Sequence, residues 1–172
     1  PAEGVTTLFP GSLQNSSTSA ATAADGLFAT LASQASTSID IALFDFDRPS
    51  VRDALLAAKA RGVGVRVVGD DEDALNPSYA PFYQSMTGAG ITVVNDTSSS
   101  LMHNKFAVFD DAVTWTGSAN FSNNAFVRNG ENVVVITSTV VAQIYGAEFD
   151  EMVGGKFHGA KSDNTAHSAT VA

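Results

Sequence analysis

The chain has 172 residues, a formal net charge of −9 from 18 acidic and 9 basic residues, and no cysteine. This length suits a single domain, and the lack of cysteine excludes disulfides, thiolate metal sites and cysteine nucleophiles. The acidic balance counts against tight, non-specific binding of nucleic acid, and no apolar run approaches the roughly 20 residues of a membrane span, so we expect no stable membrane insertion.

Strand and helix patterns alternate along the chain. The expected elements are, in chain order, a strand at 5–9, a helix at 17–36, a strand at 38–46, a helix at 49–62, a strand at 63–70, a helix at 78–90, a strand at 91–96, a two-stranded hairpin within 103–117, a strand at 131–137 and a helix at 138–155. The hairpin turns tightly at Asp110 and Asp111. This order predicts an α/β fold in which a mixed β-sheet is sandwiched between helices.

Residues 156–172 show no periodicity, so we expect one domain over 1–155 and an irregular C-terminal tail over 156–172. The chain begins at Pro1 without a methionine, which is typical of a processed product. We therefore expect a secreted or periplasmic bacterial protein.

Chemically distinctive side chains gather between residues 103 and 131. Side chains two apart on a strand share a face, so His103 and Lys105 are expected to point the same way. Ser118 and Asn120 share parity in the same manner if their segment stays extended. Lys105 offers a positive charge and Asn120 an amide donor, which together suit a phosphate group. Neutral His103 is a nucleophile for phosphorus.

A carboxylate that holds the other ring nitrogen would orient His103, and Glu131 at the start of the next strand is the candidate. The structural alternative is strong for each part alone. A lone His-x-Lys pair is most often structural or merely exposed, and a lone Gly-Ser-x-Asn is most often a turn. The combination in this order, ahead of a glutamate, favours a functional site.

These motifs resemble the phospholipase D superfamily. His103, Lys105 and Asp110 fit its His-x-Lys-x4-Asp signature, residues 117–120 fit the Gly-Ser-x-Asn that follows, and Glu131 matches the downstream acidic position. The strand–helix–strand pattern of residues 39–71 is similar to the family's lead-in. The resemblance covers roughly residues 5–155 and implies that this domain is a catalytic, phospholipase D-like domain.

The resemblance implies a phosphodiesterase that needs no metal and no cofactor and passes through a phosphohistidine. Two signature histidines act on one phosphorus there, one as nucleophile and one as general acid. This chain has one such histidine, because His158 and His167 lack the Lys-x4-Asp that would follow. The second is expected from an identical subunit in a homodimer, as in the single-signature nucleases of the family, or from a complementary second half.

Roles follow from the resemblance. His103 is the nucleophile in one subunit and the general acid in the other, while Lys105 and Asn120 bind phosphate and stabilise the transition state. Ser118 supports either the phosphate or Glu131. Asp110 sits at the far end of the strand and is expected to be structural support.

The expected substrate is a phosphodiester, with an endonuclease on DNA or RNA favoured. The alternative is a phospholipase D-type hydrolase or transphosphatidylase on phospholipids, and a silent phosphate-binding module is the least favoured. The acidic loop at 69–77 is expected to be solvated rather than a Ca²⁺ or Mg²⁺ site. Arg48, Arg52 and Arg128 either line a substrate groove or, at least as readily, are surface charges.

Overall fold

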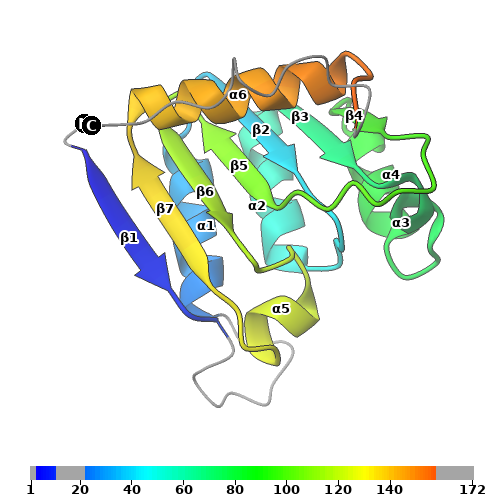
Figure 1. Ribbon diagram of the computed structural model, residues 1–172, viewed down its shortest axis with the longest axis horizontal. Helices are drawn as coiled ribbons and strands as arrows, with labels where there is room; N and C mark the ends of the chain where they lie inside the picture. Colours follow the sequence, from blue (N-terminus) through cyan, green and yellow to red (C-terminus); the bar gives the residue numbers. More distant parts are fainter. Residues whose placement is uncertain (1–2, 11–21, 158–172) are drawn as a thin grey trace.

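The computed structural model describes residues 3–10 and 22–157 (Figure 1). In these parts of the chain, seven strands form one sheet in the order β1-β7-β6-β5-β2-β3-β4. The strands are β1 (Gly4–Leu8), β2 (Ser38–Ala42), β3 (Gly64–Gly69), β4 (Thr92–Asn95), β5 (Phe106–Phe109), β6 (Val113–Gly117) and β7 (Val133–Thr137). Strands β2, β3 and β4 run parallel, whereas all pairings from β2 through β5, β6 and β7 to β1 are antiparallel. The predicted mixed sheet is confirmed.

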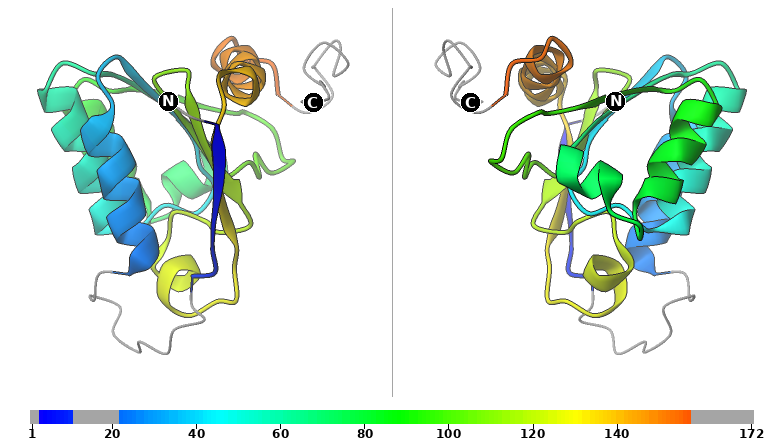
Figure 2. Two further views of the ribbon diagram at one scale, coloured as in Figure 1. Left: turned by 90° about the vertical axis from the view of Figure 1, so that its left-hand side faces the viewer. Right: turned by 90° about the vertical axis from the view of Figure 1, so that its right-hand side faces the viewer.

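Helices cover both faces of this sheet (Figure 2). Helices α1 (Ala23–Gln34), α2 (Pro49–Ala60) and α4 (Ala80–Gly88) lie on one face, and α6 (Thr139–Val153) lies on the other. Strand β5 shows why: Ala107 and Phe109 belong to the larger core under α1, α2 and α4, while Phe106 and Val108 belong to the smaller core under α6. This alternation of apolar side chains buries both faces of one strand.

Phe28 of α1 anchors the larger core. Its ring makes edge-on contacts with Phe109, Trp115 and Phe121 at centroid distances of 5.6, 5.5 and 5.6 Å. Such aromatic pairs add to the free energy gained from area burial. Because Phe121 directly follows Asn120, this packing also fixes the backbone next to a predicted site residue.

The hairpin turn lies where the sequence predicts it. Asp110 and Asp111 both have φ of 52°, and the N–H of Ala112 donates to the carbonyl of Phe109 at 3.0 Å. Aspartate tolerates this left-handed conformation better than most residues, and consecutive left-handed residues match the twist of the paired strands.

Several predicted boundaries were wrong in ways that matter for the site. The strand expected to begin at His103 begins at Phe106, and the strand expected at 38–46 ends at Ala42. Two short helices, α3 (Asp71–Leu75) and α5 (Asn123–Val127), were missed because one helical turn is too short to show a period. The expected helix residues 17–21 and most of the expected tail, 158–172, lie outside the described residues. No helix in the described parts is long and apolar enough to cross a membrane.

Candidate active site

Five of the six predicted site residues lie at one edge of the sheet, the lower edge in Figure 1 where α5 lies. The register shows this, since Ala42 at the end of β2 pairs with Phe106 at the start of β5, Phe106 pairs with Thr116 near the end of β6, and Gly117 pairs with Val133 at the start of β7. The residues just outside these strand ends are therefore neighbours. They include His103, Lys105, Ser118, Asn120 and Glu131.

His103 and Lys105 lie in the segment just before β5, and their side chains meet at the ring of Phe44. The ring centroids of His103 and Phe44 are 4.7 Å apart, and the Lys105 Nζ lies 5.1 Å from the Phe44 centroid. Asn104 faces α6 instead, with its Nδ2 3.7 Å from the Met152 Sδ. The alternation of side chains thus continues ahead of the strand, and it brings the imidazole and the ammonium to one side.

The positive charge of Lys105 is largely shielded from solvent. The residue is buried, and its Nζ donates a hydrogen bond to the carbonyl of His103 at 2.8 Å. Burial lowers the pKa of Lys105, whereas the negative charges of Asp45, Glu131 and Asp73 oppose that shift. A desolvated ammonium beside an exposed imidazole suits a phosphate ligand, because the anion would offset the cost of desolvation.

Gly117 ends β6 and allows the chain to pass close to the segment before β7. It has φ of +145°, and a Cβ at this position would lie 2.2 Å from the carbonyl oxygen of Asn132. The N–H of Ser118 donates to that same oxygen at 3.1 Å, and the N–H of Asn132 donates to the Ser118 Oγ at 3.1 Å. Only glycine fits this approach, which explains the first residue of the Gly-Ser-x-Asn motif.

Ser118 and Glu131 are joined within this close contact. The Ser118 hydroxyl donates to the Glu131 Oε2 at 2.5 Å, and the Asn129 Nδ2 donates to the Glu131 Oε1 at 3.2 Å. Of the two roles considered for Ser118, support of Glu131 therefore has the geometric backing. Among the described residues, the recorded bonds of Glu131 are to Ser118 and Asn129 and not to His103 of the same chain. The role of Glu131 in orienting a histidine therefore stays a prediction.

Asn120 is held by a residue that the sequence did not single out. Its Nδ2 donates to the Asp45 Oδ2 at 2.7 Å, and its Oδ1 is buried without a hydrogen-bond partner among the described residues. Asp45 follows β2 at the same edge of the sheet. The available signal was its place just past the end of a buried strand, but the predicted strand extended to residue 46 and concealed it.

A group of acidic and phenolic side chains surrounds Asp45. Burial, the charge of Asp45 and the charge of Asp70 raise the pKa of Asp73 to about 6. Burial and the charges of Asp45 and Asp47 raise the pKa of Tyr79 to about 12. The edge thus has a cationic part at Lys105 and an anionic part at Asp45 and Asp73.

Three other carboxylates meet near the acidic loop, with oxygens of Asp70, Asp71 and Asp96 within 4.8 Å of one another. Backbone hydrogen bonds account for their placement. Asp70 is the N-cap of α3 and also accepts the N–H of Met102 at 2.9 Å, while Asp96 accepts the N–H of Asp71 at 3.1 Å. These carboxylates tie α3 to the segment that leads to His103.

Asp110 lies at the opposite edge of the sheet from the other signature residues. Its carboxylate accepts the backbone N–H groups of Ser36, Thr37 and Ser38 at 2.8 to 3.1 Å, and the hydroxyls of Ser36 and Thr37 as well. Partial burial would raise the pKa of Asp110, but these hydrogen bonds lower it to about 2. The carboxylate holds the turn between α1 and β2.

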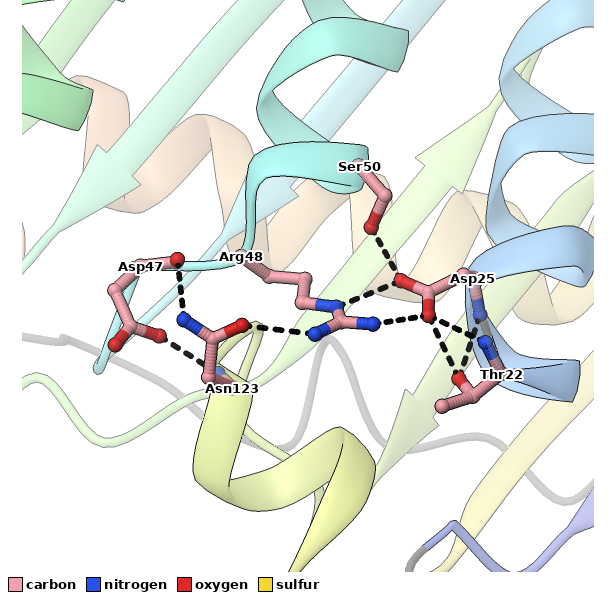
Figure 3. A network of polar contacts seen from close by, with 6 residues as sticks. All are labelled: Thr22, Asp25, Asp47, Arg48, Ser50 and Asn123. Carbon is pink, nitrogen blue, oxygen red and sulfur yellow. Dashed lines mark hydrogen bonds and ion pairs between the residues drawn. The ribbon is translucent and has the colours of Figure 1, made fainter. Parts of the chain in front are cut away.

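Arg48 was expected in a groove or on the surface, and both expectations were wrong. It is buried and pairs with Asp25 of α1, with Nε to Oδ1 at 2.8 Å and Nη2 to Oδ2 at 2.5 Å (Figure 3). Its Nη1 donates to the Asn123 Oδ1 at 2.8 Å, and the backbone N–H of Asn123 donates to Asp47 at 2.7 Å. The ion pair therefore ties the segment after β2, which carries Asp45, to α1 and α5.

The other two arginines are less buried, and neither is placed in a groove by its contacts. Arg52 pairs with the neighbouring Asp53 at 2.7 Å and covers the ring of Phe82. Arg128 is exposed and lies 3.4 Å from the Asn124 Oδ1. The surface interpretation fits both.

Comparison with solved structures shows the same fold elsewhere. A phospholipase D family member, Nuc from Salmonella typhimurium, superposes with a TM-score of 0.79 at 26% identity, covering 90% of this chain and 96% of that chain. NucT from Helicobacter pylori superposes with a TM-score of 0.72 over 90% of this chain and 98% of that chain. At 22% identity, the second likeness concerns the fold alone.

Among curated proteins, the mitochondrial cardiolipin hydrolase of Xenopus laevis is 37% identical over 115 residues, which cover 67% of this chain and 54% of that protein. Its counterpart in Homo sapiens is 38% identical over 127 residues, 73% of this chain and 48% of that protein. The chain thus spans about half the length of the curated relatives that it matches. The names and organisms of these relatives do not support the expectation of a secreted or periplasmic bacterial protein.

A family model described as "Cardiolipin synthase, PLD-like domain" matches residues 28–153. The match spans more than half of the chain and contains every member of the cluster at the sheet edge. The protein therefore belongs to the phospholipase D superfamily.

Proposed function

We propose that the protein is a metal-independent phosphodiester hydrolase that acts through a phosphohistidine at His103. The observation that carries the proposal is the meeting of His103 and Lys105 on one side of Phe44, at the sheet edge that also presents Asn120 and the Ser118–Glu131 pair. These groups supply a nucleophile, a cation and an amide donor without a metal ion.

The reaction needs two imidazoles, a neutral one as the nucleophile and a protonated one as the general acid. A ring nitrogen of neutral His103 attacks phosphorus, the bond from phosphorus to the leaving oxygen breaks, and a second, protonated imidazole gives its proton to that oxygen. The second imidazole, now neutral, accepts a proton from water as the water oxygen attacks phosphorus. The phosphorus–nitrogen bond then breaks, which restores His103. The charge of Lys105 stabilises the negative oxygens in both steps.

The second imidazole comes from a second copy of the chain. A two-fold axis at the site edge would place His103 of each subunit on opposite sides of one phosphate, as in-line displacement requires. The other histidines, His158 and His167, lie outside the described residues. A complementary second half with its own signature is the alternative source.

Two substrate classes have support. The likeness to Nuc over nearly all of that chain favours a nuclease, which we place first. The second candidate is a phospholipid hydrolase, and the names of the curated relatives favour it. The net charge of −9 and the carboxylates of Asp45 and Asp73 beside Lys105 also favour it, because they repel a polyanionic strand.

The test is an assay in excess EDTA with two substrates in parallel. Supercoiled plasmid DNA reports nicking, and vesicles of cardiolipin or phosphatidylcholine report phosphodiester cleavage. We expect turnover of at least one substrate. We also expect a covalent adduct on His103 that carries the phosphorus with its remaining nucleotidyl or phosphatidyl ester, detected by mass spectrometry after acid-free quenching. A strict requirement for a divalent ion, or binding of phosphate without any turnover, would contradict the proposed chemistry.

Sedimentation of the active sample tests the shared site. We expect a dimer under assay conditions, with activity that falls upon dilution below the dissociation constant. Full activity in a purely monomeric sample would remove the partner histidine from the mechanism.

A further inference from the structure

The segment after β2 and the segment after β6 are held side by side by the backbone. Phe46 and Phe121 form a parallel bridge, and the N–H of Arg48 donates to the carbonyl of Phe121 at 3.2 Å. Asp45 and Asn120 each directly precede a bridged phenylalanine. Both phenylalanines are fully buried in the core, so the two polar side chains are set opposite each other by packing.

The Asp45 carboxylate is the hydrogen-bond partner of the Asn120 amide. The Asn120 Nδ2 donates to the Asp45 Oδ2 at 2.7 Å. The Asp73 carboxyl of α3 and the Tyr79 hydroxyl at the N-cap of α4 lie near enough for the charge of Asp45 to raise their pKa values.

An amide group has two N–H bonds and one carbonyl, and it can turn over about its terminal torsion. The bond to Asp45 uses one N–H of Asn120 and fixes which end of the amide faces the carboxylate. Among the described residues no other bond of this Nδ2 is recorded, so its second N–H can bind a nonbridging phosphate oxygen. Without Asp45, either orientation of the amide would be accessible.

We propose that Asp45 is a positioning residue that fixes the Asn120 amide for phosphate binding. The inference rests on the proposed function, since it assigns a use to the amide in phosphodiester hydrolysis. Asp45 acts through Asn120 and does not itself touch the phosphate.

The charges around Asp45 and Asp73 decide how these two carboxyl groups respond to pH. Asp45 faces Asp73 from α3, Tyr79 from α4 and Lys105 from the segment before β5, and Asp47 stands on its own segment. Asp73 also faces Asp70 and Glu72 of its own region. Lys105 is the cation recorded among these neighbours, so a second negative charge on the pair is poorly compensated.

Burial and the charge of Asp45 raise the pKa of Asp73 to about 6. Below that pH Asp73 is protonated and does not repel Asp45. Above it, two carboxylates repel each other and the amide loses part of its support. We therefore expect the activity to decline as the pH rises through about 6 to 7, in addition to any effect of His103.

Three variants test the proposal in the full chain. Asp45→Ala should lower kcat about 10- to 100-fold, the range expected when a positioned group is displaced by about 1 Å. Asp45→Asn should recover much of that loss, because its carbonyl still accepts from Asn120. Asp73→Asn should remove the decline above pH 6, because its side-chain amide does not ionise. Asp53→Asn, at an exposed position of α2, is the matched control and should leave both kcat and the pH profile unchanged.

A measurement without turnover separates this inference from the proposed function. The side-chain N–H resonances of Asn120, assigned by their loss in Asn120→Asp, should shift with a midpoint near pH 6 in the wild type. They should not shift there in Asp73→Asn. Resonances that ignore pH in the wild type, or an Asp45→Ala variant with wild-type kcat and pH profile, would overturn the positioning role while hydrolysis stands. An inactive wild type would overturn the hydrolase, and the resonances would still decide the role of Asp45.

Discussion

The two ends of β5 carry residues of one sequence signature and differ in how their polar groups are used. At the far end, Asp110 accepts hydrogen bonds from three backbone N–H groups and two hydroxyls. At the near end, His103 is exposed, and the ammonium of Lys105 has one hydrogen bond recorded, to the carbonyl of His103. The hydrogen-bonding capacity of the far end is used within the fold, whereas the polar groups of the near end can still bind a ligand.

The same difference appears in the ionisation of the carboxyl groups. Hydrogen bonds from neutral donors lower the pKa of Asp110 to about 2 despite partial burial. Burial and neighbouring carboxylates raise the pKa of Asp73 to about 6. A carboxylate surrounded by donors stabilises the fold when charged, while one surrounded by other carboxylates does so when protonated. The near end therefore has polar groups whose placement costs stability, which is common at functional sites.

The largest expected effect is the loss of activity in His103→Ala. We expect kcat to fall by at least about 10⁴-fold, as for other covalent nucleophiles, with an unchanged melting temperature because the side chain is exposed. Steady-state assays and thermal unfolding measure the two quantities. Asn104→Ala is the control and should remain active, because the Asn104 side chain is next to His103 in the sequence but faces α6. Comparable activity of the two variants would contradict the functional role that we assign to the near end of β5.

Lys105→Met should have the next largest effect. We expect kcat/KM to fall by about 10²- to 10³-fold, since a preorganised charge at the developing negative oxygens is removed. The free energy of unfolding should change little, because burial lowers the pKa of Lys105 and an apolar side chain of similar length avoids that desolvation. Lys59→Met in α2 serves as the control. A large loss of stability with intact kcat/KM would make Lys105 a structural residue.

Gly117→Ala should affect both stability and activity. The added Cβ would meet the Asn132 carbonyl oxygen at 2.2 Å in a left-handed backbone, so we expect the free energy of unfolding to fall by about 3 kcal/mol or more. Urea unfolding measures this. Gly130→Ala is the matched control, because nothing lies within 4 Å of its added Cβ. Equal stability of the two variants would show that the close approach is not required.

Asp110→Asn should have the smallest effect and should leave kcat unchanged. Asparagine tolerates the φ of 52°, so the substitution removes the charge without new backbone strain. We expect a loss of about 1–2 kcal/mol at neutral pH, after allowance for the solvent around this partly exposed group. The folded-state pKa is lowered, so the wild-type advantage is present above about pH 4 and disappears as the pH falls towards about 2.

Urea unfolding at several pH values measures that advantage. Asp111→Asn shares the φ of 52° and is exposed, so it should cost little at any pH. A decrease in kcat for Asp110→Asn at full stability would place the far end of β5 in the catalytic machinery.

Much of this architecture follows from local sequence patterns. Short apolar runs predicted the strands, the order of strands and helices predicted a sheet covered on both faces, and the Asp110–Asp111 pair predicted the hairpin turn. The short helices α3 and α5 escaped prediction because their formation depends on the caps Asp70 and Ser122 and on packing. The early end of β2 was also missed, since an apolar run does not show where strand pairing stops.

Residue types at fixed spacings were enough to predict the α/β fold, the family and the candidate site residues His103, Lys105, Ser118, Asn120 and Glu131. The packing of the folded chain was needed to find Asp45 as the partner of Asn120 and Arg48 as a buried ion pair with Asp25. These partners are 75 and 23 residues apart in the chain. Such contacts depend on strand order and on the packing of buried side chains, which no local pattern records.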